Sequence, residues 1–270
     1  MQLKKQHTIY NHQKIMKKLF SIFSLFGFLF VFAQESTENL IVHYQSLVKI
    51  DLDKALSKIP PQKRAEVEAM LRDESKNGIS IDYTLKTNGK QSVYQIVEKI
   101  DNSQSEGGQI ANMIRQNDSS PYYKNIAKGY YVVQFNITGL PNYITKDSLG
   151  TFNWKITREK SQILGYEVRK AIGEKEGQKI IAWYAPKLNI KDGPAHISGL
   201  PGLILKTESE LPKMGATLTI TATKIKISTT KIEINEPTKG IFVTEKELNE
   251  KIKAHKEKAR AIMSNGIDTD

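Results

Sequence analysis

The chain has 270 residues, a net charge of +11 and no cysteine. The lack of cysteine excludes disulfide bonds, a thiol nucleophile and thiolate metal sites. Five lysines and no acidic residue lie in the first 33 positions, so the remainder carries a charge of +6, with lysine and glutamate interspersed as on a solvated surface. This pattern has no basic footprint for nucleic acid, which we exclude from the expected partners.

The N-terminal region has the three parts of a secretory signal peptide. Two lysines precede an almost unbroken apolar run, residues 19–32, and Ala33 is a small residue suited to cleavage before Gln34. The run is shorter than the ~20 residues of a membrane span, although an uncleaved anchor is the alternative. We predict that residues 1–33 are a signal peptide, and Met16 is an alternative start of translation. We also predict that the protein is exported to the periplasm, where association with the outer membrane is a further option.

The first elements after the signal are a strand and a broken helix. Residues 34–48 include the apolar run NLIVHYQSLV, which predicts a strand. A helical pattern follows over residues 54–76, where Pro60 and Pro61 interrupt the segment. Because proline is accepted in the first turn of a helix, Pro61 suits the start of the second helical piece.

Alternation of apolar and polar residues is clearest in ISIDYTLKTNGKQSVYQIVEK. The pair Asn88-Gly89 in its middle tolerates positive φ and predicts the two-residue turn of a β-hairpin. Residues 101–121 follow and are rich in Ser, Asn and Gly. We expect a long mobile loop there, with one helical turn around residues 110–115.

From Tyr122 onward the sequence reads as strands about ten residues apart, which predicts a meandering antiparallel sheet. The candidates are KGYYVVQFNI, GTFNWKIT, ILGYEVRKAI, QKIIAWYAP, GLILKTES, ATLTITATKIKIS and KIEIN. The apolar phase shifts between Ala222 and Ile225, which predicts a bulge. Thr244 and Glu247 then have the spacing of a capping box at the start of a last helix.

Together these elements predict an α+β protein. We expect a single domain, residues 34–270, built on one strongly curved and mainly antiparallel β-sheet. This sheet is a half-barrel-like meander, and helices near 54–76 and 244–263 pack on it. No membrane span is expected once the signal is removed.

The stretch GPAHISGLPGLILKTES places a turn rich in glycine and proline before a strand. Gly199 and Gly202 can take positive φ, while Pro201 fixes its own φ and lacks a donor. We interpret GLPG as a structural turn of type II with Pro201 and Gly202 at its centre. Leu200 and Leu203 are then expected to be apolar plugs at one end of the core. Shaping the sheet edge is favoured over contact with a ligand.

Several longer motifs lie around this turn in a fixed order. They are FNWKIT, ILGYEVRKA, IIAWYAP, DGP and GLPGLILK, and they span about residues 120–210. In this set and order the chain resembles the GLPGLI family of exported bacterial proteins. The resemblance implies an envelope protein associated with outer-membrane transport, and it implies no particular reaction. Many members carry Cys where this chain has Val168, so no thiol role is carried over.

Residues near the turn also invite a catalytic interpretation. His196 lies between Asp192 and Ser198 in the sequence, and a Ser-His-Asp hydrolase would use these residue types. No G-x-S-x-G elbow and no H-E-x-x-H motif accompanies them. We therefore assign no catalytic residue, no metal and no cofactor. Tyr184 follows Trp183 on a predicted strand, so the two side chains point to opposite faces, and Tyr184 is a candidate for ligand contact.

These observations favour a non-enzymatic periplasmic binding or accessory protein. Its partner is expected to be a hydrophobic small molecule or an outer-membrane transport protein. The candidate ligand or partner surface consists of Tyr184, Asp192, His196, Ser198, Leu200 and Leu203. A hydrolase or metal-dependent enzyme centred on His196, and a structural envelope protein without a ligand, are the two alternatives.

Overall fold

The computed structural model describes residues 39–97, 111, 115, 120–150, 152–175 and 177–265. The chain divides into two compact units, Met1–Ser36 and Thr37–Asp270, and all of the described residues belong to the second. The predicted signal peptide lies outside the described residues. So does most of the predicted loop 101–121, of which Ala111 and Arg115, both helical, and residues 120–121 are described.

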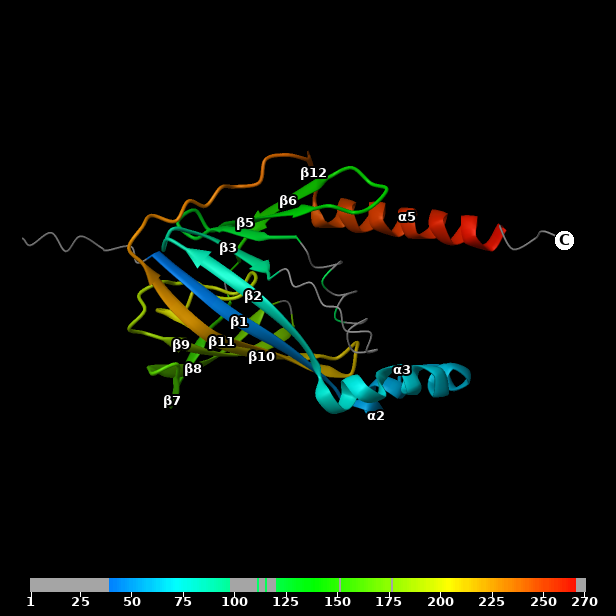
Figure 1. Ribbon diagram of the computed structural model, residues 1–270, viewed down its shortest axis with the longest axis horizontal. Coiled ribbons are helices and arrows are strands. Elements are labelled where there is room, and N and C mark those ends of the chain that lie inside the picture. The colour runs from blue at the N-terminus through cyan, green and yellow to red at the C-terminus, as the bar shows by residue number, and fades with distance from the viewer. Residues whose placement is uncertain are drawn as a thin grey trace, which may run out of the picture. The chain divides into compact units, whose positions relative to one another are not determined.

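The described residues of this unit form one sheet of 12 strands, which curls on itself (Figure 1). The strands are β1 (Asn39–Ile50), β2 (Ile79–Thr87), β3 (Gln91–Ile96), β4 (Tyr122–Asn125), β5 (Tyr130–Phe135), β6 (Tyr143–Ser148), β7 (Lys155–Ile163), β8 (Tyr166–Lys175), β9 (Gln178–Ala185), β10 (Leu203–Leu211), β11 (Ala216–Ser228) and β12 (Ile241–Phe242). Their order across the sheet is β12-β6-β5-β4-β3-β2-β1-β11-β10-β9-β8-β7. Two meanders therefore meet where β1 pairs with β11, and the pairs between described strands are antiparallel apart from β12 with β6.

Helices lie where the sequence predicts them, and the α+β fold class is confirmed. The first region holds α2 (Leu52–Leu56), the short 3-10 helix η1 (Pro61–Lys63) and α3 (Arg64–Asn77), and the last is α5 (Glu245–Asn265). The capping box is present, because the Glu247 carboxylate accepts from the Thr244 backbone N–H at 2.8 Å. The Glu247 N–H in turn donates to Thr244 Oγ1 at 3.2 Å. Within the described part of the chain, no helix is both long and apolar enough to cross a membrane.

Two local predictions hold, one with a shift. The hairpin of β2 and β3 forms, but its turn is shifted by one residue. The Asn88 N–H donates to the Gln91 carbonyl at 3.1 Å, so the two central turn residues are Gly89 and Lys90. The side chain of Asn88 accepts from the N–H groups of both Lys90 and Gln91, and only Gly89 needs positive φ, at 79°. The predicted bulge is also present: the register of β11 against β1 skips one residue, Thr223.

The predicted strand KIEIN is wrong. Residues 231–235 form no strand, although Ile232 and Ile234 pack against Tyr123, Val132 and Ile144. The Ile232 N–H donates to the side chain of Asn39 at 3.2 Å. The alternating apolar residues of this segment are thus buried against a face of the sheet, although the segment forms no strand itself.

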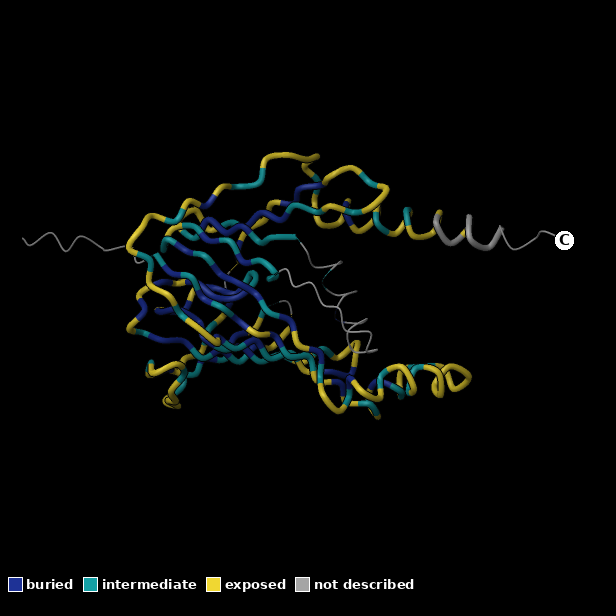
Figure 2. Tube along the Cα trace, viewed as in Figure 1, coloured by how far each residue is buried: buried dark blue, intermediate teal, exposed yellow. Residues whose placement is uncertain are grey.

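Aromatic residues concentrate on the face of the sheet that we call the inner face. Tyr44 pairs with Tyr83 across β1 and β2, and Tyr94 pairs with Tyr122 across β3 and β4. The rings of Tyr83 and Tyr94 stack with centroids 4.8 Å apart. Burial follows the strands, whereas α3 and the described part of α5 are largely exposed (Figure 2).

The GLPG segment precedes β10 but is not a type II turn. The Gly202 N–H donates to the Leu200 carbonyl at 2.8 Å, which closes a three-residue γ-type turn around Pro201. In a type II turn the Leu203 N–H would donate to the Leu200 carbonyl, but here it donates to the Leu188 carbonyl at 3.0 Å. The φ of Gly202 is 151°. A Cβ at Gly202 would lie 2.3 Å from the Ala185 carbonyl oxygen. The glycine is therefore needed for close approach of two backbone segments.

Replacing Gly202 by alanine is expected to destabilise the fold by roughly 3 kcal/mol or more, because both the φ angle and the space forbid a Cβ. The matched control is Gly129→Ala, since Gly129 also has positive φ but has no other atom within 4 Å of a built Cβ. We expect this control to cost about 1 kcal/mol. Urea unfolding of both variants measures the difference, and equal losses would contradict the close-approach explanation.

Candidate functional site

The segment that joins β9 to β10, residues 186–202, supplies apolar side chains to two cores. Leu188 and Ile190 pack with the inner tyrosines and β10, and Ile197 and Leu200 pack with Tyr184 and Ile204. Backbone hydrogen bonds between residues close in sequence fold the segment tightly. For example, the Ile190 N–H donates to the Leu188 carbonyl at 2.7 Å. We call this segment the β9–β10 loop, and it is a packed part of the interior.

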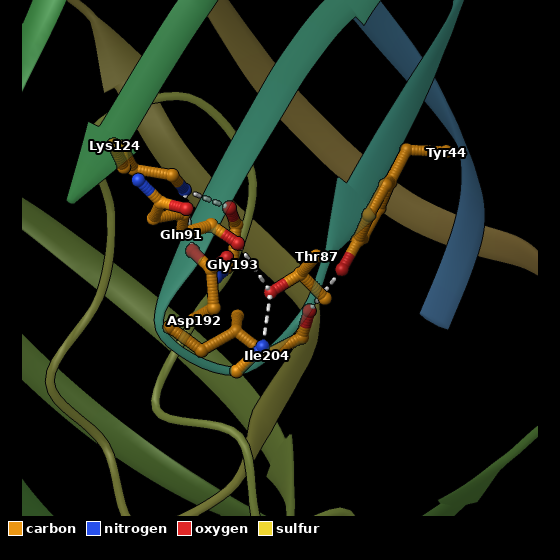
Figure 3. A network of polar contacts seen from close by, with 8 residues as sticks. Tyr44, Thr87, Gln91, Lys124, Asp192, Gly193 and Ile204 are labelled. Atoms are coloured by element: carbon orange, nitrogen blue, oxygen red, sulfur yellow. Dashed lines mark hydrogen bonds and ion pairs between the residues drawn. The ribbon is translucent and has the colours of Figure 1, made fainter. Parts of the chain in front are cut away.

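A buried ion pair fixes the middle of the β9–β10 loop to β4. The Lys124 ammonium lies 2.5 Å from Asp192 Oδ1, and both side chains are fully buried. Lys124 also donates to the Gly193 carbonyl at 2.5 Å, and the Gly193 N–H donates to Asp192 Oδ1 at 2.7 Å (Figure 3). Charged groups without access to water need such partners, so each group here depends on the other.

The surroundings of Lys124 act on its charge in opposite directions. Desolvation by burial lowers the pKa of Lys124 below its ordinary value, and it outweighs the attraction of Asp192, which raises it. The pair is therefore costly to bury, and breaking it leaves one uncompensated charge inside the protein.

The same network extends from the β9–β10 loop to β10 and β1. The Ile204 N–H donates to the Asp192 carbonyl at 2.9 Å, and Tyr44 Oη donates to the Ile204 carbonyl at 2.7 Å. Burial, and in second place the charge of Asp192, raise the pKa of Tyr44 well above its ordinary value, so its hydroxyl stays a donor. Lys124 and Tyr44 come from different strands of the first meander, and the loop between them belongs to the second (Figure 3).

Four residues after Asp192, His196 lies at the end of a row of stacked rings. Phe152 stacks on Trp154 with centroids 5.1 Å apart and on His196 with centroids 5.9 Å apart. Trp154 Nε1 donates to the Ser198 carbonyl at 3.0 Å, which anchors the row to the β9–β10 loop. The φ of Ala195, just before the histidine, is 48°, an uncommon value for a residue other than glycine. His196 is thus held by stacking and by the folded loop.

A cleft of about 320 Å³ opens beside His196. One side of it belongs to neighbouring strands β4, β5 and β6, with Tyr122, Tyr131, Val133, Phe135, Thr145 and Asp147. The other residues that line it are Phe152, Lys175, Gln178, His196 and Glu245. Register places Tyr122, Val133 and Thr145 in one cross-strand row and Lys124, Tyr131 and Asp147 in the next. The cleft and the buried ion pair therefore share the inner face of β4 and β5.

The structure places the predicted surface residues in different settings. Tyr184, Leu200 and Leu203 are at most 1% exposed and belong to the cores, and Ser198 is buried. Asp192 is fully buried on Lys124, and His196 is half-buried at the cleft. Within the described part of the chain, no cluster of three or more histidine and carboxylate side chains could hold a metal ion.

Sequence reasoning missed Lys124 and most of the cleft. Lys124 lies in the run YYKN, where it shares a face with Tyr122, and this apolar setting for a lysine was the available signal. Asp147 and Gln178 carry no local signal, because they meet only through the curling of the sheet. Glu245 reaches the cleft from the first turn of α5.

The fold and the site define a class: a curled antiparallel sheet whose inner face holds a packed loop and a cleft. The model of a known family, described as "N-glycanase peptide, N-terminal domain", matches residues 81–253. The chain belongs to this family. No curated protein matches it.

One solved structure of PNGF-II supports the fold. The structure of PNGF-II in the C2 space group is 17% identical, with a TM-score of 0.51 over 79% of this chain and 32% of that chain. A second PNGF-II structure, in the P21 space group, gives 19% identity and a TM-score of 0.48 over the same shares. A putative outer membrane lipoprotein-sorting protein domain from Vibrio parahaemolyticus gives 8% identity and a TM-score of 0.25, over 74% and 89%. This chain therefore spans about a third of the length of PNGF-II.

Removing one partner of the buried pair is expected to be severe. Lys124→Met leaves the Asp192 carboxylate buried and uncompensated, and it should lower the free energy of unfolding by roughly 3–5 kcal/mol. Lys124→Met/Asp192→Asn should recover most of this loss, because Asn keeps an oxygen for the Gly193 N–H.

The matched control is Lys54→Met, which breaks the pair of Lys54 with Asp51, whose side chains are 75% and 44% exposed. This change should cost less than about 1 kcal/mol. Chemical denaturation of the three variants gives the values. A Lys124→Met variant as stable as Lys54→Met would show that the buried pair is not a structural requirement.

Proposed function

We propose that the protein is a non-enzymatic binding or accessory protein of the cell envelope, exported to the periplasm, which holds a small ligand in the cleft beside His196. One observation carries the proposal. Aromatic and polar side chains converge on a cleft whose walls are strands and a loop fixed by a buried ion pair. Concave sites with a few convergent polar groups on a rigid scaffold are the usual places for small ligands.

The ligand surface expected from the sequence changes in one respect. Tyr184, Leu200 and Leu203 are committed to core packing and offer no surface to a hydrophobic molecule. His196 is the member of the predicted set that lines the cleft. A purely hydrophobic ligand is therefore less well supported than one with polar groups.

A hydrolase centred on His196 has little support from the same geometry. Asp192 uses Oδ1 for Lys124 and for the Gly193 N–H, and Ser198 is buried. In a Ser-His-Asp triad the carboxylate would instead orient the histidine. The binding proposal needs no such arrangement.

The accessory part of the proposal has two supports. The family description names the N-terminal domain of an N-glycanase, and this chain spans about a third of PNGF-II, so a supporting role beside other domains or proteins fits it. The motifs that resemble the GLPGLI family support an outer-membrane transport protein as the partner. The signal-peptide pattern of residues 1–33 supports export.

Native mass spectrometry of the full chain, expressed and gently purified from a periplasmic extract, tests the proposal. We expect a bound small mass that disappears on denaturation, on a protein cleaved before Gln34. Gln178→Trp should abolish the bound mass, because Gln178 is exposed and lines the cleft.

The matched control is Gln62→Trp, an exposed position on η1, which should keep the bound mass. A protein that carries no small mass, or one whose bound mass is unaffected by Gln178→Trp, would contradict the proposal.

A further inference from the structure

The cleft combines two kinds of surface that few ligands match at once. Tyr122, Tyr131 and Phe135 line the cleft with aromatic rings, and the ring centroids of Tyr122 and Tyr131 lie 6.4 Å apart with their planes tilted by 33°. Aromatic faces carry partial negative charge and attract weakly positive C–H groups. One part of the ligand should therefore present a flat apolar face rich in C–H groups.

Polar groups of every hydrogen-bonding type surround these rings. Asp147 is exposed and accepts one hydrogen bond, from the Ser148 N–H at 2.6 Å, which leaves acceptor capacity for a ligand. Gln178 brings both a donor and an acceptor, and Lys175 is a donor whose ammonium lies 5.8 Å from the centre of the Phe152 ring. The ligand should thus carry groups that both donate and accept, as hydroxyls do.

Charge and polarity exclude two other ligand classes. A phosphate or carboxylate ligand would need several cationic donors, but among the described residues that line the cleft Asp147 and Glu245 oppose one lysine, Lys175. An alkyl chain would remove water from Asp147, Lys175 and Gln178 without giving them hydrogen-bond partners, which disfavours its binding.

We propose that the cleft binds a neutral carbohydrate, with a sugar ring stacked on the aromatic side chains and its hydroxyls bonded to Asp147, Gln178 and Lys175. The inference rests on the proposed function, since it names the ligand of the same cleft. A pyranose ring has an apolar face of C–H groups and a rim of hydroxyls. These two features match the two surfaces of the cleft.

Isothermal titration calorimetry of the full chain with named probes tests the inference. The probes are four neutral oligosaccharides (maltotriose, cellotriose, mannotriose and N,N′-diacetylchitobiose), with palmitate and inorganic phosphate for comparison. We expect at least one of the four sugars to bind. Asp147→Ala and Phe135→Leu should each raise its Kd at least tenfold, because one removes an acceptor and the other removes an aromatic ring.

The matched control is Asp73→Ala, an exposed aspartate on α3, which should leave the Kd unchanged. One result would overturn the carbohydrate inference but leave the proposed binding function intact. In that result no sugar binds, whereas palmitate or phosphate binds and Asp147→Ala weakens this binding. Sugar binding that is insensitive to both cleft variants also overturns the inference. If no probe binds, the inference fails, and the native-mass experiment separately decides the proposed function.

Discussion

The buried contact between Lys124 and Asp192 is the constraint on which the interior of this protein depends. Two fully buried charges can persist only if each keeps its partner, so β4 and the β9–β10 loop must meet at one place. The backbone of Gly193 and Ile204 completes the contact, and Tyr44 extends it to β1. A single polar network thus links the two meanders of the sheet within its curl.

The same contact has a consequence for the cleft. With Asp192 fixed, the following residues bring His196 onto Phe152, and Trp154 holds the segment at Ser198. At the far end of the loop, Gly202 lets the chain pass close to Ala185 as it enters β10. The GLPG motif is therefore a device of backbone geometry that closes the loop, and the same loop brings His196 to the cleft.

Sequence patterns predicted those features that depend on neighbours in the chain. Alternation located most of the strands but missed β4, β6 and β12. The phase shift near Thr223 located the bulge, and the spacing of Thr244 and Glu247 located the last helix. Long-range features were harder to predict. The partner of Asp192 lies 68 positions away in β4, and no local pattern distinguishes Lys124 from other lysines unless its aromatic neighbours are weighed. Ile232 and Ile234 alternate with polar residues as in a strand because both pack on one face of the sheet. This alternation explains why the sequence predicted a strand over residues 231–235.

Amide hydrogen exchange of the unmodified protein, followed by NMR, tests most directly whether the β9–β10 loop is a fixed part of the core. The amides of Gly193 and Ile204 donate inside the buried network, to Asp192 Oδ1 and to the Asp192 carbonyl. We predict that they exchange as slowly as the central amides of β1 and β11, through global unfolding. Exchange at the rate of exposed loop amides would contradict this prediction, because the loop would then open independently of the sheet.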